Sequence, residues 1–260
     1  MNKSGKQISK TRLAFFIIFS ILILACAVFS LILPELAIDT SAWAWLSESL
    51  IKMVAIGLVF LMSLCLLKIN KKSIFLTISL IAYCVAAYFL FSLSDAENLD
   101  QITLAQDIML YSMLAHQLVL AVYSVVISKG AGLKVLNIAV RVALSLIAYF
   151  VLTEYLPEYF DLRNSLFIIY LINSLVTLIS FSCCFKKYFL MIFGVLLSTV
   201  GAVFYAFSFG WLTLFNITGN FAEFVTSFDF GFLLSIIGIY LIGCEAVFSG
   251  IYKNSHLTTL

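Results

Sequence analysis

The chain has 260 residues, of which 63% are hydrophobic and only 11% are charged, and its formal net charge is +2. A soluble domain is about half apolar and about a quarter charged, so this composition excludes an ordinary globular protein. It also excludes a disordered chain and an extended nucleic-acid surface, because apolar residues dominate and there is no basic excess. Since one membrane crossing takes about 20 apolar residues, the composition predicts a helical membrane protein with several crossings.

Eight apolar segments follow one another along the chain, joined by short polar connectors. Each is long enough to cross a bilayer as a helix, because backbone groups in hydrocarbon must form their hydrogen bonds internally. Continuous rather than alternating hydrophobicity excludes a β-barrel. We therefore predict an all-α polytopic membrane protein, a single integral membrane domain (1–260) that is a bundle of eight transmembrane helices. The predicted helices are 12–33, 49–67, 74–93, 108–128, 133–153, 164–181, 188–209 and 230–250.

Charged residues alternate between two sets of connectors. Twelve of the 15 Lys and Arg residues precede the first helix, follow the last, or lie in every second connector, and 12 of the 13 acidic residues lie in the other connectors. Because basic residues collect on the cytoplasmic side, this alternation predicts both termini in the cytoplasm. We expect a multi-pass protein of the bacterial inner membrane. A glycosylation sequon at Asn216 leaves a eukaryotic origin open.

The cysteines and the N-terminal segment each allow a second interpretation. The run ending in Cys26 resembles a lipoprotein cleavage site, but a further apolar run follows it, so we expect a retained signal anchor. The six cysteines lie within helices or at their cytoplasmic ends, which argues against a disulfide framework. No Cys/His spacing indicates a metal site, and no metal or cofactor is expected. Packing is the simplest role for the cysteines, and lipidation of Cys183 and Cys184 is the alternative.

Two opposite charges lie at comparable depth in the inner half of the predicted bundle. Arg141 is eight residues, or about 12 Å, from the inner end of its helix, and Glu245 is at a similar depth on the eighth helix. An ionisable side chain at mid-bilayer costs about 2.5–3.5 kcal/mol unless it is compensated. We expect a buried Arg141–Glu245 ion pair that clamps two helices together, with an ion-coupling role as the alternative.

A second group of polar residues lies in the outer half of the predicted bundle. Lys52 is about one turn inside the second helix, and Asp95 ends the third. His116 lies about 12 Å below the outer surface on the fourth helix. The other members of the group are Tyr170 and Asn173 on the sixth helix and Tyr205 and Ser208 on the seventh. A histidine, an acid and a lysine at one depth favour an outward-facing polar pocket, although a lone intramembrane histidine often only bonds a neighbouring helix.

Short motifs around these residues resemble the YhhN family of lysoplasmalogenases. Residues 91–99 (FSLSDAENL) look like that family's F-S-x-x-G-D-x-x-L segment, and 109–116 (MLYSMLAH) look like the helix that follows it. Residues 201–209 (GAVFYAFSF) resemble its G-A-x-x-F-x-x-S-D segment, Lys52 falls where the family has a lysine, and Tyr170 falls where it has a tyrosine. Two departures stand out: Ser94 replaces a glycine, and Phe209 replaces the second intramembrane Asp.

The resemblance implies hydrolysis of the vinyl ether of a lysolipid in the membrane, without a cofactor. It implies catalytic roles for Asp95 and His116. Lys52, Tyr170, Asn173, Tyr205, Ser208 and Asp229 are expected to bind the substrate, with Asp229 or Glu223 in the role of the missing carboxylate. Membrane lipids are the expected partners, and the oligomeric state stays open. The alternatives are a lipid-binding or small-molecule transport protein that keeps the scaffold without the chemistry, and an accessory subunit.

Overall fold

The computed structural model describes residues 10–32, 48–66, 77–78, 81–82, 84–85, 88, 99–128, 130–156, 161–183, 188–209 and 228–255. Within these ranges all the regular secondary structure is helical. The helices are α1 (Lys10–Ile32), α2 (Glu48–Leu66), α4 (Leu99–Ile127), α5 (Ala131–Phe150), α6 (Leu162–Ser182), α7 (Phe189–Ser208) and α9 (Phe228–Ser255), and a π-helical segment (Val151–Tyr155) continues α5. The seven described residues from Thr77 to Tyr88 are also helical.

Helix length and composition confirm the coarse prediction of a helical membrane protein. Four described helices are long and apolar enough to cross a membrane, and their spans are Asp100–Val126, Ala131–Tyr155, Leu162–Ser182 and Phe189–Ser208. Shorter apolar stretches lie within α1, α2 and α9, and their bounds are Leu13–Phe29, Ile51–Met62 and Phe230–Glu245. Most of the predicted third span, 74–93, lies outside the described residues.

α4 and α9 extend furthest beyond their predicted bounds. α4 begins at Leu99 rather than at residue 108, and α9 continues to Ser255 rather than ending at residue 250. Hydropathy marks only the apolar part of a helix, whereas the hydrogen-bonded backbone continues into polar sequence. Asp100 in the first turn of α4 favours this extension, because a carboxylate near a helix N-terminus interacts favourably with the helix dipole.

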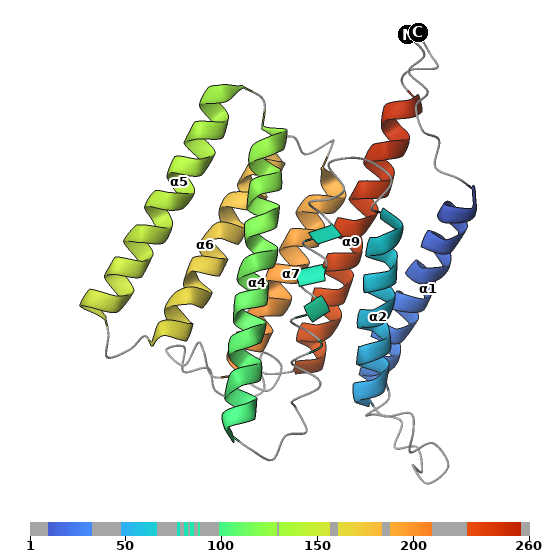
Figure 1. Ribbon diagram of the computed structural model, residues 1–260, viewed down its shortest axis with the longest axis horizontal. Helices are drawn as coiled ribbons and strands as arrows, with labels where there is room; N and C mark the ends of the chain where they lie inside the picture. Colours follow the sequence, from blue (N-terminus) through green and yellow to red (C-terminus); the bar gives the residue numbers. More distant parts are fainter. Residues whose placement is uncertain are drawn as a thin grey trace.

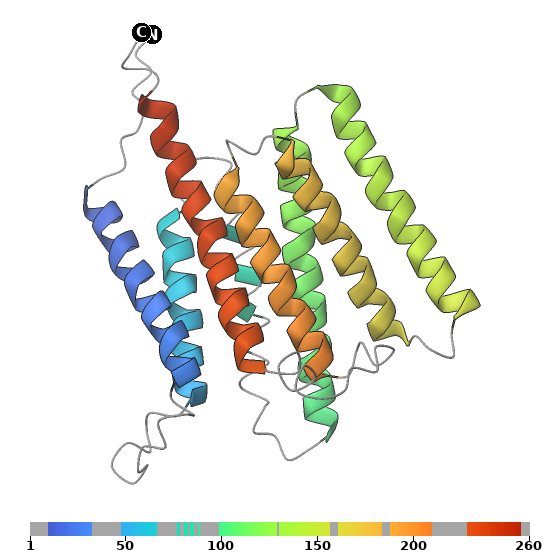
Figure 2. The ribbon, with the colours of Figure 1, turned by 180° about the vertical axis from the view of Figure 1, so that it is seen from behind.

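The helices form an antiparallel bundle with α7 and α9 at its centre (Figure 1). α1 and α2 pack against α9. On the other side of the bundle α6 packs against α7, and α4 and α5 pack against α6 (Figures 1 and 2). The beginning of α1 and the end of α9 lie at the same end of the bundle. The first and last helices, α1 and α9, are therefore neighbours although they are far apart in the sequence.

Most charged residues of the described helices separate between the two ends of this bundle, and Lys52 and Arg163 are exceptions. Lys10 and Arg12 in α1, Lys134 in α5 and Lys253 in α9 are placed by their helices at one end, here called the basic end. The other end is here called the acidic end, because the helix ends there carry Glu48, Asp100, Asp107, Glu154, Asp161 and Asp229. This separation agrees with the alternation of charge read from the connectors.

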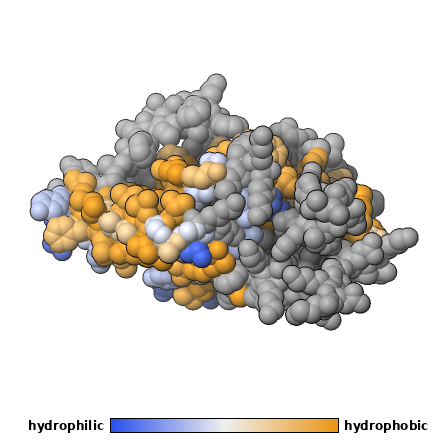
Figure 3. Space-filling view, turned by 90° about the horizontal axis from the view of Figure 1, so that it is seen from above, coloured by the Kyte–Doolittle hydropathy of each residue, from blue (hydrophilic) through white to orange (hydrophobic). Residues whose placement is uncertain are grey.

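Large apolar side chains cover the outside of the bundle. On α5, Val135 and Leu146 are 66% and 63% exposed, and Leu133, Leu136 and Ile147 are similarly open. Figure 3 shows hydrophobic residues spread over the side of the molecule on which α5 and α6 lie. Soluble monomers rarely expose continuous apolar surface of this kind, whereas a lipid-facing helix requires it.

Glycine and serine line the contact between α7 and α9. Gly194, Ser198 and Gly201 on α7 face Gly231, Ser235 and Gly238 on α9. A Cβ atom added at Gly194 would lie 2.7 Å from the Gly238 carbonyl oxygen, and one added at Gly238 would lie 2.6 Å from the Gly194 carbonyl oxygen. Small residues let helix backbones approach this closely in membranes, where packing rather than the hydrophobic effect holds helices together.

Gly238→Ala will destabilise the protein, because its new methyl group meets the α7 backbone and forces the two helices apart. We expect a loss of about 1–3 kcal/mol, the usual range for overpacking. Thermal unfolding in detergent measures the loss.

Gly132→Ala on α5 is the matched control, since a Cβ atom there has no neighbour within 4 Å. Its melting temperature should stay the same or rise slightly. Equal melting temperatures for Gly238→Ala and Gly132→Ala would show that the α7–α9 contact is not close-packed.

Candidate functional site

Lys52 points into the bundle from α2. It belongs to the buried face that also contains Ala55, Ile56 and Val59, and its side chain is only 4% exposed. The Lys52 Nζ atom lies 5.8 Å from the ring centroid of Phe232 on α9, which is fully buried. A cation over an aromatic face is attracted by the ring quadrupole, most strongly where water is excluded. Lys52 is therefore an interior cation near the acidic end.

His116 points into the bundle from α4. It continues the buried face formed by Met109, Met113 and Leu120, and it is only 1% exposed. In the described part of the chain no Cα atom of α4 lies within 8 Å of a Cα atom of α2. The helical residues between Thr77 and Tyr88 lie between the two helices in both views (Figures 1 and 2). His116 and Lys52 thus enter the interior from opposite sides of this segment.

Tyr170 and Tyr205 are buried where α6 meets α7. Both are 2% exposed, and the Tyr170 ring stacks on Phe167 at 5.7 Å between centroids. The Tyr170 side chain lies against Thr199 of α7. Ser208 donates a hydrogen bond to the Phe204 carbonyl oxygen at 2.9 Å, within its own helix. Tyr170 and Tyr205 are therefore interior residues, whereas Ser208 is only partly buried.

Of the three acidic candidates, only Asp229 lies among the described residues. Asp95 and Glu223 lie outside the described residues. Asp229 lies in the first turn of α9, three residues before Phe232, the ring that Lys52 covers. Phe209, at the position of the family's second Asp, is packed against the hydrophobic core.

An ion pair joins α4 to α6 and gives a reference level at the acidic end. Arg163 donates to both carboxylate oxygens of Asp107, at 2.5 and 3.1 Å. Measured along the helices at about 1.5 Å per residue, Tyr170 lies about 10 Å and His116 about 14 Å inside this pair. Lys52 is only about 6 Å from the start of α2 by the same measure. The candidates are therefore staggered in depth along the bundle.

Arg141 bonds to uncharged acceptors on three helices. Its Nε donates to Asn137 Oδ1 at 2.7 Å, its Nη1 donates to the Asn173 carbonyl oxygen at 3.0 Å, and its Nη2 donates to Ser124 Oγ at 3.1 Å. Asn137 in turn donates to Ser180 Oγ at 2.8 Å. The network ties α5 to both α4 and α6.

The predicted ion pair between Arg141 and Glu245 is wrong. Within the described chain no Cα atom of α5 comes within 8 Å of one of α9, since α6 and α7 lie between them. Glu245 is buried on α9, where its side chain is only 4% exposed. Equal depth along two helices does not make the helices neighbours.

Asn173 belongs to the Arg141 network rather than to a group around His116. Its Nδ2 donates to Ser145 Oγ on α5 and to the Ile169 carbonyl oxygen, both at 3.0 Å. The structure thus gives Asn173 a packing role where the sequence analysis expects substrate binding. Asn137 was not predicted from the sequence, although its spacing of four residues from Arg141 places both on one helix face.

Comparisons with protein-family models, with curated proteins and with solved structures find no match for this chain. The resemblance to the YhhN family therefore remains a prediction from short motifs. What the structure adds is the interior position of Lys52, His116, Tyr170 and Tyr205.

Double-mutant cycles separate the observed network from the predicted pair. Arg141→Met and Asn137→Ala should be coupled by about 0.5–3 kcal/mol, because each removes the other's hydrogen-bond partner. Arg141→Met and Glu245→Gln should be additive within about 0.5 kcal/mol, as expected for distant sites. Unfolding free energies in detergent give both values. Strong coupling to Glu245 with additivity at Asn137 would restore the ion pair.

Proposed function

We propose that the protein is a membrane-embedded hydrolase of lysolipids that resembles the lysoplasmalogenases. The observation that carries the proposal is the burial of Lys52 and His116, two ionisable side chains that face the interior of the bundle and not lipid. An ionisable residue within a membrane is costly, so its retention in the interior favours a functional role. The motifs around residues 91–99 and 109–116 supply the class of reaction.

The proposed reaction is acid–base hydrolysis of a vinyl ether. Asp95 donates a proton to the carbon atom two bonds from the ether oxygen, which leaves an oxocarbenium ion. His116 takes a proton from a water molecule as that water adds to the cation. As the hemiacetal breaks its bond to the glycerol oxygen, His116 gives its proton to that oxygen and the hemiacetal hydroxyl gives its proton to the Asp95 carboxylate. A fatty aldehyde and a glycerophospho-alcohol are released, and both side chains regain their starting protonation states. Glycosidases stabilise a similar cation with two carboxylates.

The remaining candidates bind the substrate in this proposal. Lys52 attracts the phosphate of the headgroup, and Tyr170, Tyr205 and Ser208 contribute hydroxyl groups. Asp229 takes the role of the second carboxylate, which is supported by its place one turn from the Phe232 ring that Lys52 covers.

A non-catalytic lipid-binding or transport protein is the second candidate. Phe209 favours it, because an apolar ring packed on the core stands where the family pattern has an acid.

We propose further that the chain crosses the membrane eight times, with both termini in the cytoplasm of a bacterial cell. Two observations support this topology. The described helices reverse direction from one to the next except at α2 and α4, which run the same way and are separated in the chain by the helical residues between Thr77 and Tyr88, and most of the basic residues gather where α1 begins and α9 ends. The positive-inside rule assigns that end to the cytoplasm.

An activity assay tests the function. The purified protein should release fatty aldehyde from lysoplasmalogen, and His116→Ala should lower kcat by about 10²–10⁴-fold, the usual contribution of a general acid or base. Asp95→Asn should have an effect of the same order.

The matched control is His256→Ala, which changes the other histidine of the chain, beyond the last residue of α9. It should keep full activity. Absence of aldehyde from the wild type, with retained binding of lysolipid, would support the second candidate instead.

Reporter fusions test the topology. Green fluorescent protein fused after Leu260 should fluoresce, since it folds in the cytoplasm, and alkaline phosphatase at that position should be inactive. Phosphatase inserted between residues 210 and 227 should be active. The opposite pattern would reverse the orientation of the bundle.

A further inference from the structure

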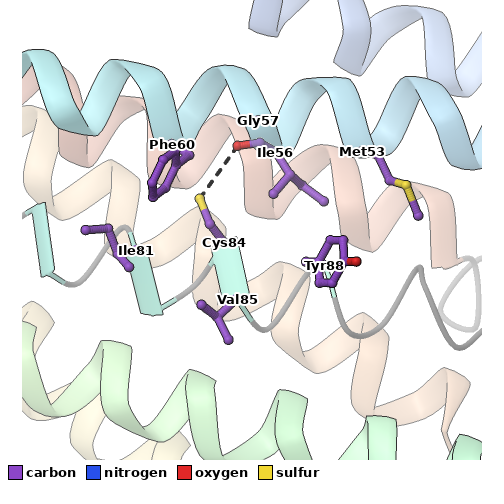
Figure 4. Close-up of a pocket in the computed structure, with 8 residues that line it drawn as sticks. All are labelled: Met53, Ile56, Gly57, Phe60, Ile81, Cys84, Val85 and Tyr88. Carbon is purple, nitrogen blue, oxygen red and sulfur yellow. Dashed lines mark hydrogen bonds between the residues drawn. The ribbon is translucent and has the colours of Figure 1, made fainter.

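An apolar groove lies between α2 and the helical residues Ile81, Cys84, Val85 and Tyr88. Its cavity volume is about 290 Å³. The lining residues are Met53, Ile56, Gly57 and Phe60 from α2 and Ile81, Cys84, Val85 and Tyr88 from the facing segment, as Figure 4 shows. None of these side chains is charged.

The spacing of the lining residues explains the shape of the groove. On each wall the residues stand at positions i, i+3, i+4 and i+7, which is one face of a helix. The two walls meet where Cys84 Sγ donates to the Ile56 carbonyl oxygen at 3.7 Å. Beside this contact a Cβ atom at Gly57 would have no neighbour within 4 Å. The missing side chain of Gly57 therefore leaves the groove open.

The groove runs along the bundle from the acidic end toward its middle. Met53 and Tyr88 lie at one end, and Phe60 and Ile81 lie at the other (Figure 4). Met53 and Phe60 are seven residues apart, which is about 10 Å along a helix. One leaflet of a bilayer has about 15 Å of hydrocarbon, so the groove spans about two thirds of that depth.

The groove is also open to the side of the bundle. Tyr88 is 54% exposed, Val85 is 43% exposed and Phe60 is 38% exposed, so its rim faces the surroundings of the bundle. In a membrane those surroundings are lipid chains, which can enter sideways without crossing water.

We propose that this groove binds the single hydrocarbon chain of a lysolipid; the choice of ligand rests on the hydrolase proposed above. A drug-sized ligand fills a pocket of about 300–1,000 Å³, so the volume suits one chain rather than the two chains of a diacyl lipid. The uncharged lining matches hydrocarbon.

The charge of Lys52 indicates how the ligand is oriented in the groove. Lys52 precedes Met53 on α2, so a cation lies at the acidic end of the groove and none lines the groove itself. A phosphate headgroup is attracted to that end, and the chain then extends toward the middle of the bundle.

Photolabelling tests the groove. The full-length protein in phosphatidylcholine nanodiscs is irradiated with lysophosphatidylethanolamine that carries a diazirine in the middle of its acyl chain. Peptides that contain residues 53–60 and 81–88 should carry the label. Unlabelled lysophosphatidylethanolamine should compete, and dioleoyl phosphatidylethanolamine should not.

Gly57→Leu should reduce this labelling at least tenfold, because the new side chain fills the open space. Gly132→Leu is the matched control, a glycine on α5 that is equally free of neighbours, and it should label like the wild type. If Gly57→Leu does not accumulate, Val85→Phe fills the groove from the opposite wall. Label spread evenly over the exposed helices, or equal competition by the diacyl lipid, would overturn the proposal.

The outcomes separate the groove from the proposed hydrolase. Labelling of the groove without any aldehyde release supports the chain site and rejects the catalytic proposal. His116-dependent aldehyde release without labelling of the groove supports the hydrolase and rejects the chain site.

Discussion

The close approach of α7 and α9 is the contact on which the rest of the bundle depends. Glycine and serine at spacings of three and four residues on both helices leave no room for larger side chains, so backbone meets backbone along the length of the contact. α1 and α2 then pack on α9, and α6 packs on α7. Lys52 reaches Phe232 and Tyr170 reaches Thr199 only because these central helices hold their places. The positions of Lys52 and Tyr170 therefore depend on this central pair of helices.

A polar network complements this apolar packing at the edge of the bundle. α5 exposes most of its surface, and Arg141 holds it to α4 and α6. A buried arginine costs about 2.5–3.5 kcal/mol at the centre of a membrane helix. Three intramembrane hydrogen bonds of about 0.6–1.7 kcal/mol each offset most of that cost. Arg141 thus acts through hydrogen bonds with neutral partners and not through an ion pair.

The sequence predicts the properties of single helices well, and it predicts the contacts between two helices poorly. Hydropathy and charge identify the apolar helices, and the buried faces that hold Lys52 and His116 follow from their position inside apolar runs. Hydropathy does not show which helices are neighbours, because every helix that can face lipid has a similarly apolar surface. Arg141 and Glu245 match in depth and sign, yet two helices separate them. The Asp107–Arg163 pair was not predicted for the same reason, because it too joins two helices whose contact hydropathy does not show.

The central proposal is that an acid, Asp95, transfers a proton to a carbon atom of a lysolipid within this bundle. Hydrolysis of lysoplasmalogen in D₂O, followed by mass spectrometry of the aldehyde, tests it most directly. The proposed reaction places one deuterium on the carbon next to the aldehyde group, because the acid draws its proton from solvent. Aldehyde without deuterium at that carbon, or release of a fatty acid in place of the aldehyde, would contradict the account.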